Sequence, residues 1–157
     1  LIGWAATAPA FGYDNFAGLT SLLEAGGWCL VLLMVVWQIP HFLAIAWMYK
    51  DDYAAGGYRM MPIIDPDGRA TATTVMVWSI ALLGATLAPG FILHEQLSWA
   101  YTAIAGVTGL VFIALCVRLL RSRTRDNART VFLASIMHLP LLLIAMVGDA
   151  LVGRFLL

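Results

Sequence analysis

The chain has 157 residues, of which 62% are hydrophobic and only 11% are charged. An average soluble domain has roughly 45–50% apolar and about 25% charged residues, so this composition excludes an ordinary soluble domain and predicts a protein embedded in a lipid bilayer. The formal net charge is zero, which removes the bulk electrostatic attraction that favours binding to nucleic acid.

The N-terminal part of the chain does not contain a full membrane span. Leu1–Ala8 is apolar but too short to cross a bilayer, and Pro9 and Gly12 end it. The segment 11–27 is expected to be a polar-edged loop with a short interfacial helix. Because the chain begins without Met, and its first residues resemble the end of an apolar helix, we expect it to be the C-terminal half of a longer protein.

Four later segments are long and apolar enough to cross a membrane, for which a helix needs about 20 residues. They predict an all-α fold, a single transmembrane helix bundle of four full spans preceded by one partial N-terminal span. Gly84 and Ala88, and likewise Ala105 and Gly109, have the spacing of small residues that lets helices approach closely. The expected spans are about 26–49, 72–93, 98–120 and 130–152, with connecting loops at about 50–70 and 121–129.

Nearly all the positively charged residues lie at span ends that alternation places on one side of the membrane. Because Lys and Arg in short loops stay on the cytoplasmic side, both connecting loops are predicted to be cytoplasmic, in a bacterial inner membrane. Trp28 and Trp99, at the opposite ends of their spans, fit an aromatic belt at the other interface. The eight residues on the predicted cytoplasmic side are Lys50, Arg59, Arg69, Arg118, Arg121, Arg123, Arg125 and Arg129, and the ninth, Arg154, lies on the other.

One stretch, from Trp37 to Gly57, combines an ionisable residue inside a span with charged residues at the end of that span. At about 100° per residue, Gln38, His41, Tyr49 and Asp52 share one helix face if the helix continues through them without a kink. Ionisable residues inside a span usually face the bundle interior and mark a site. A neutral histidine hydrogen-bonded to a neighbouring helix is the competing interpretation.

Lys50, Asp51 and Asp52 are candidates for binding Mg²⁺ together with a diphosphate group. Magnesium is usually held by one or two carboxylates plus phosphate oxygens, and a lysine ammonium pairs with the remaining phosphate charge. Their spacing alone favours a simpler interpretation, a solvated helix end. His138 is interpreted as a packing or capping residue, and the arginines between 118 and 129 as determinants of topology.

The sequence WQIPHFLAIAWMYKDDYAAGGYRMMPIIDPDG, from Trp37 to Gly68, carries a resemblance. It is similar to the second conserved region of the haem O synthases (protohaem IX farnesyltransferases), a branch of the UbiA-type membrane prenyltransferases, and the opening LIGWAA resembles the segment before that region. The resemblance implies a helix bundle around a central cavity in which two aspartate-rich motifs bind Mg²⁺ and an isoprenyl diphosphate. This chain would correspond to the C-terminal half, because nothing in it supplies the first motif.

The resemblance also implies roles for individual residues of the second motif. Asp52 would bind the metal, with Asp51 beside it where the family often has glutamate. Lys50 stands where the family often has arginine, and it would hold the phosphates together with Arg59; the lysine keeps the charge but loses the planar bidentate geometry.

The haem side of the cavity would be lined by His41, which would orient the haem, with Gln38 and Tyr49 on the same face. His138 departs from the family pattern, since that position more often holds tyrosine, and no shared role is carried over to it.

The implied function is transfer of a farnesyl group from farnesyl diphosphate to the vinyl group of haem b, giving haem O for haem-copper oxidase biogenesis. One alternative is another UbiA-type enzyme that prenylates an aromatic ring or a chlorin. A second alternative, from a different class, is a haem-binding membrane protein without catalysis, which would release no diphosphate. Because half of the metal site is absent, we expect these residues alone to be inactive.

Overall fold

The computed structural model describes residues 24–156, with side chains described through Gly153. The short apolar segment expected at 1–8 and most of the loop expected after it lie outside the described residues. Within the described range every regular element is helical. The helices are α3 (Ala25–Met48), α4 (Lys50–Ala55), α5 (Met61–Ile64), α6 (Arg69–Ile92), α7 (Trp99–Arg121) and α8 (Arg125–Leu156).

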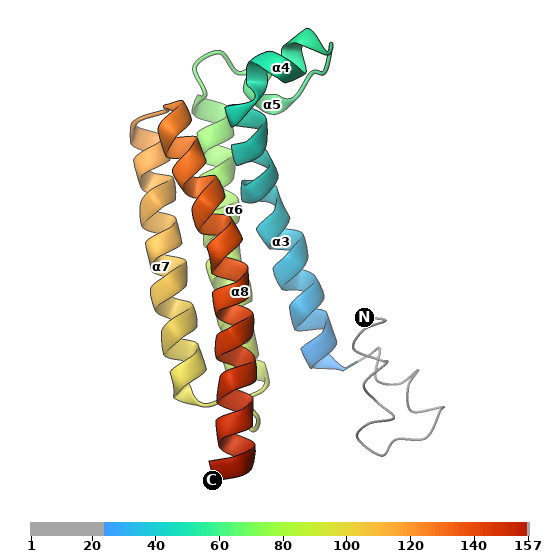
Figure 1. Cartoon of the computed structure of the whole chain (residues 1–157), viewed down its shortest axis with the longest axis vertical. Helices are drawn as coiled ribbons and strands as arrows, with labels where there is room; N and C mark the ends of the chain where they lie inside the picture. Colours follow the sequence, from blue (N-terminus) through green and yellow to red (C-terminus); the bar gives the residue numbers. More distant parts are fainter. Residues whose placement is uncertain (1–23, 157) are drawn as a thin grey trace, which may run out of the picture.

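The four long helices form an up-and-down bundle, and α4 and α5 lie together at one end of it (Figure 1). Helix α3 packs against α6 and α8, and α7 packs against the same two helices, so the four form a closed ring of neighbours. In the described part of the chain, all four are long and apolar enough to cross a membrane. The predicted all-α membrane bundle is therefore confirmed.

Two connections contain more helix than the sequence suggested. The segment expected to be a loop at about 50–70 contains α4 and α5. Helix α8 begins at Arg125, inside the other expected loop, because side chains cap its first turn. Thr124 Oγ1 accepts a hydrogen bond from the Asn127 backbone N–H at 3.3 Å, and the Asn127 side-chain amide donates to Ser122 O at 2.6 Å. These bonds satisfy amide groups that would otherwise lack partners.

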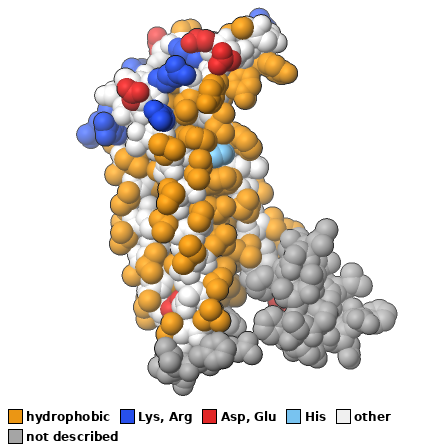
Figure 2. Space-filling view, viewed as in Figure 1, with side chains coloured by type: hydrophobic (Ala, Val, Ile, Leu, Met, Phe, Trp, Pro, Cys, Tyr) orange, Lys and Arg blue, Asp and Glu red, His pale blue; other side chains and the backbone are white. Residues whose placement is uncertain are grey.

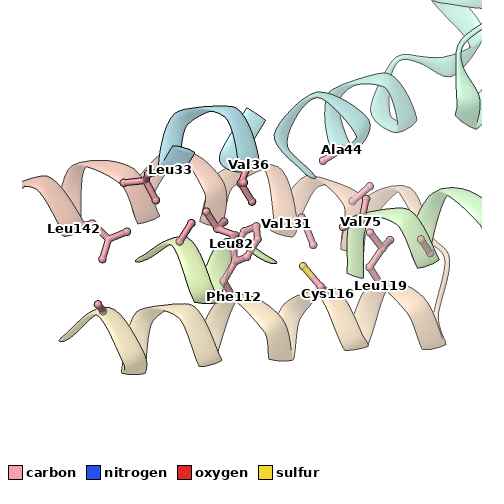
Figure 3. Close-up of a cluster of buried hydrophobic side chains, with 14 of the residues drawn as sticks. Leu33, Val36, Ala44, Val75, Leu82, Phe112, Cys116, Leu119, Val131 and Leu142 are labelled. Carbon is pink, nitrogen blue, oxygen red and sulfur yellow. The ribbon is translucent and has the colours of Figure 1, made fainter. Parts of the chain in front are cut away.

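Apolar side chains from all four long helices meet along the bundle axis, as Figure 3 shows for Leu33, Leu82, Phe112 and Leu142. In a bilayer, such helices associate through close packing rather than through the hydrophobic effect. The predicted close approach at Gly109 is confirmed, since an added Cβ there would lie 2.5 Å from Leu83 Cδ1 on α6. At Gly84 no described residue of a neighbouring helix lies within 4 Å of the position that a Cβ would take, so the same prediction is not confirmed there.

Aromatic side chains donate hydrogen bonds to backbone carbonyls near the prolines inside α6 and α8. A proline removes one backbone N–H donor and pushes away the carbonyl of the preceding turn. Tyr101 Oη on α7 donates to Thr86 O, three residues before the α6 proline, at 2.9 Å. Trp37 Nε1 on α3 donates to Ser135 O, five residues before the α8 proline, at 2.8 Å. Both bonds tie one helix to a backbone carbonyl of another helix.

At the end of the bundle opposite α4, Asp149 of α8 holds the start of α7. Its carboxylate accepts hydrogen bonds from the Ser98 backbone N–H at 2.6 Å and from Ser98 Oγ at 2.5 Å. Ser98 Oγ in turn accepts the N–H of Ala100 at 3.0 Å, which is the usual arrangement of a helix N-cap. The last helix is thereby fixed to the turn between α6 and α7.

At the α4 end, two contacts hold the loop that precedes α6. Asp65 accepts hydrogen bonds from the Thr71 backbone N–H at 2.7 Å and from Thr71 Oγ1 at 2.9 Å. Burial raises the pKa of the Asp65 carboxyl, but hydrogen bonds from Thr71 and the neighbouring amides lower it, and the net pKa lies below its ordinary value. Gly68 has φ +65°, and a Cβ added there would lie 2.6 Å from the buried ring of Trp47.

Replacing Gly68 with Ala should destabilise the bundle. The left-handed backbone costs about 1–2 kcal/mol for a residue with a Cβ, and the methyl group would also displace the Trp47 ring. Gly57→Ala is a matched control, because Gly57 has φ +77° but no neighbouring atom within 4 Å. Unfolding of both variants in detergent micelles should show the larger loss for Gly68→Ala. Equal losses would contradict the tight contact with Trp47.

The Asp65 hydrogen bonds predict a pH dependence of stability. Because the folded pKa of Asp65 is lowered, its contribution is fully present above the unfolded pKa of about 3.9 and is lost as the pH falls through the folded value. Asp65→Asn should therefore cost about 0.5–1 kcal/mol at pH 6, since solvent screens part of the effect, and progressively less below about pH 4. Unfolding midpoints of the wild type and the variant between pH 6 and pH 3 measure this difference. A difference independent of pH would show that Asp65 does not act through its charge.

Candidate functional site

Charged side chains gather at the end of the bundle that carries α4, whereas the face shown is mainly hydrophobic along its length (Figure 2). This end includes the predicted site residues Lys50, Asp51, Asp52 and Arg59, all of which are exposed. The prediction that most Lys and Arg residues lie toward one end of the spans agrees with this arrangement.

The predicted stripe along one continuous helix stops at Tyr49. Helix α3 ends at Met48, Tyr49 has a non-helical φ of −112° and ψ of 25°, and α4 begins at Lys50. Asp51 and Asp52 both fall in the first turn of α4, where the helix dipole favours carboxylates. Asp52 therefore belongs to a separate short helix, and the two aspartates share one turn at the helix end.

The oxygen ligands of Asp51 and Asp52 are of the type that Mg²⁺ prefers, although they do not complete a coordination sphere. Among the described residues no group of three or more potential metal ligands is present. Lys50, Asp51 and Asp52 also form no ion pair with another described residue. Their charges are thus available to a ligand, and a metal bound here would need further oxygens from phosphate, from water or from residues outside the described range.

The turn after α4 folds back onto that helix and leads to Arg59. The Tyr58 N–H donates to Tyr53 O at 3.0 Å, and the two tyrosine rings meet edge to face at a centroid distance of 6.0 Å. Gly57 permits this reversal with φ +77°. Arg59 follows the turn and is exposed, without a hydrogen bond to any described residue.

Lys50 lies beside an arginine that the sequence pattern associates only with membrane topology. A small pocket is lined by Lys50, by Arg123 from the connection between α7 and α8, and by Asp65 and Asp67 from the loop before α6. The buried Trp47 also contributes to its wall. Asp51 and Asp52 do not line this pocket, so Lys50 shares it with Arg123 and not with the aspartates that follow it in the sequence. No sequence signal joins Lys50 to Arg123, because their proximity depends on tertiary packing.

His41 lies between α3 and α8 and is fixed on several sides. Its Nδ1 is 2.8 Å from Ser135 Oγ on α8. The Trp37 ring stacks on the imidazole at a centroid distance of 4.5 Å and an interplanar angle of 22°, and the Phe132 ring lies 5.3 Å away. The competing interpretation of His41 was a histidine hydrogen-bonded to a neighbouring helix, and this hydrogen bond is present. Ser135 was not among the predicted site residues, because the rotation of α8 that brings it to His41 leaves no local signal.

The other two residues predicted on the face of His41 differ in exposure. Gln38 is half-buried and makes no hydrogen bond with a described residue, whereas Tyr49, at the end of α3, is 46% exposed. His138 on α8 is 4% exposed and stacks on Phe112 at 5.6 Å, which agrees with its interpretation as a packing residue.

Three curated proteins that are similar in sequence to this chain all have the same name. The chain is 38% identical over 128 residues to a protoheme IX farnesyltransferase from Solibacter usitatus, covering 82% of this chain and 43% of that protein. It is 35% identical to one from Salinibacter ruber, covering 90% of this chain and 48% of that protein. It is 37% identical to one from a Nostoc species, covering 96% and 47%. The chain thus spans somewhat less than half the length of these curated relatives.

No solved structure showed significant similarity to this fold. The sequence profile of the UbiA prenyltransferase family matches residues 1–142, which is most of the chain. The chain therefore belongs to the UbiA prenyltransferase family.

Proposed function

We propose that the full-length protein containing this chain transfers the farnesyl group of farnesyl diphosphate to the vinyl group of haem b, forming haem O for haem-copper oxidase biogenesis. The observation that carries this proposal is the identity of 34–38% to several proteins named protoheme IX farnesyltransferase over most of the chain. Because this chain spans somewhat less than half the length of those relatives, the activity is proposed for the full-length protein.

The α4 end of the bundle binds the diphosphate. Asp51 and Asp52 hold Mg²⁺, which when bound neutralises the charge of the leaving diphosphate. Lys50 and Arg59 contact the remaining phosphate oxygens. The exposure of these four side chains and their lack of described ion pairs support this assignment.

The acceptor lies deeper, along the face of His41. From His41 to Met48, the last residue of α3, the chain rises by about 10 Å along the helix axis at 1.5 Å per residue. A planar haem beside His41 would then place one edge toward the diphosphate end. The aromatic rings of Trp37 and Phe132 offer apolar surface for the macrocycle. Gln38 on α3 and Tyr49, just after the end of that helix, flank it.

The reaction balances with one water molecule. The bond between farnesyl C1 and the diphosphate oxygen breaks, and diphosphate leaves with the electron pair. Farnesyl C1 forms a bond to the terminal vinyl carbon of haem b. A water oxygen then adds to the inner vinyl carbon and loses its proton, which gives the hydroxyethyl farnesyl side chain. The apolar bundle restricts other water from the allylic cation.

Asp52→Ala in the full-length protein should abolish haem O formation while the protein remains folded in the membrane. Loss of a metal ligand removes several kcal/mol of leaving-group stabilisation, so the rate should fall at least about 100-fold. Haem O is quantified by chromatography after incubation with haem b and farnesyl diphosphate. Asp126→Ala is the matched control, an exposed aspartate in the first turn of α8 that lies outside the motif and outside the pocket lined by Lys50.

Near-normal turnover of Asp52→Ala would contradict the metal role. Diphosphate release with a quinone-type or chlorin acceptor, but not with haem b, would instead identify another prenyltransferase of the family. Absence of diphosphate release from the wild type with every acceptor would favour a haem-binding protein without catalysis.

The membrane orientation also follows from the charge distribution. The eight Lys and Arg residues toward the α4 end support a location of that end on the cytoplasmic side of a bacterial inner membrane. In right-side-out spheroplasts, a membrane-impermeant maleimide should label Trp99→Cys, whose native side chain is 80% exposed. Arg59→Cys should be labelled only after permeabilisation. The reverse pattern would overturn the orientation, and the native Cys29 and Cys116 are buried, which keeps the background low.

A further inference from the structure

Ser135 on α8 makes two hydrogen bonds through its hydroxyl group. Its Oγ lies 2.6 Å from Phe132 O and 2.8 Å from His41 Nδ1. A carbonyl oxygen only accepts, so the single hydroxyl hydrogen must be donated to Phe132 O. Ser135 Oγ can then only accept from His41. The imidazole therefore carries a proton on Nδ1, and in the neutral ring Nε2 is left unprotonated.

The same serine also fixes the position of the ring through its backbone. Ser135 O accepts the indole N–H of Trp37 at 2.8 Å, and the Trp37 ring stacks on His41 at 4.5 Å. Ser135 itself is fully buried. The imidazole is therefore held by a hydrogen bond at one nitrogen and by an aromatic face, both of which depend on Ser135.

The second nitrogen of His41 stays open. No described residue forms a hydrogen bond with His41 Nε2. The described part of the chain has one buried side-chain nitrogen or oxygen without a partner, and this is His138 Nε2. His41 Nε2 is thus accessible, in contrast to the enclosed histidine one turn beyond Ser135.

We infer that Ser135 is a positioning residue that holds His41 as the Nδ1–H tautomer, so that the free Nε2 lone pair is directed to the iron of the haem substrate. The identity of the ligand rests on the proposed function, whereas the tautomer does not. Histidines that bind metals commonly donate their other ring N–H to a fixed acceptor, which sets both the tautomer and the ring orientation.

The tautomer is tested directly by NMR of the full-length protein labelled with ¹⁵N-histidine, with His41→Ala used to assign the signals. Wild-type His41 should show a protonated Nδ1 and an unprotonated Nε2. Ser135→Ala should give a mixture of tautomers, and Ser135→Thr should restore one form, because its hydroxyl reaches the same carbonyl. Ser79→Ala is the matched control, since Ser79 is also buried and its hydroxyl donates to Val75 O at 2.6 Å. Unchanged His41 signals in Ser135→Ala would overturn the inference.

Haem binding tests the role of the open nitrogen. The Soret band of added haem should show imidazole coordination that is lost in His41→Ala and retained in His94→Ala, an exposed histidine outside the site. Ser135→Ala should weaken haem affinity about 10-fold, with the KM for farnesyl diphosphate unchanged and with recovery in Ser135→Thr. Equal losses in Ser135→Ala and Ser79→Ala, or an unchanged spectrum in His41→Ala, would overturn the inference. If the wild type makes no haem O but its haem spectrum still depends on Ser135, the proposed function fails and the inference stands.

Discussion

The absence of water from the bilayer interior requires that every backbone N–H and C=O find a partner within the protein. The long apolar helices meet this requirement, except near the prolines inside α3, α6 and α8. Tyr101 and Trp37 donate to carbonyls beside two of these prolines. The bond from Trp37 also brings α3 and α8 together where His41 meets Ser135. At the candidate acceptor site, a bond to a backbone carbonyl and a contact between two side chains thus connect the same two helices.

The helical architecture was predictable because each spanning helix is encoded by one continuous segment of the sequence. A run of about 20 apolar residues between charges has few alternatives to a spanning helix. The clustering of charged residues at one end was predictable for the same reason, since charges mark the ends of spans. The end of α3 at Met48 agrees with the span expected at about 26–49. The new helix α4 was not predicted, because the charged residues that begin it also fit a solvated span end followed by a loop.

The candidate site was predictable only in the part that one segment of sequence encodes. His41, Asp51 and Asp52 were found because they are unusual in or beside an apolar span. Ser135 was not predicted, because the sequence does not show which face of α8 packs against α3, and a single serine in a helix does not by itself indicate a site. Arg123 was assigned to topology for a similar reason, and only the packing of the connections places it beside Lys50.

Helix α8 is the last of the long helices to leave the ribosome, and it holds two partners that the others need. Ser135 completes the surroundings of His41, and Asp149 secures the turn between α6 and α7 at the opposite end. During synthesis, α3, α6 and α7 would therefore enter the membrane before His41 has its hydrogen-bond partner. The histidine acquires a defined tautomer only when α8 joins α3, so the acceptor side of the site matures later than the segment that encodes it.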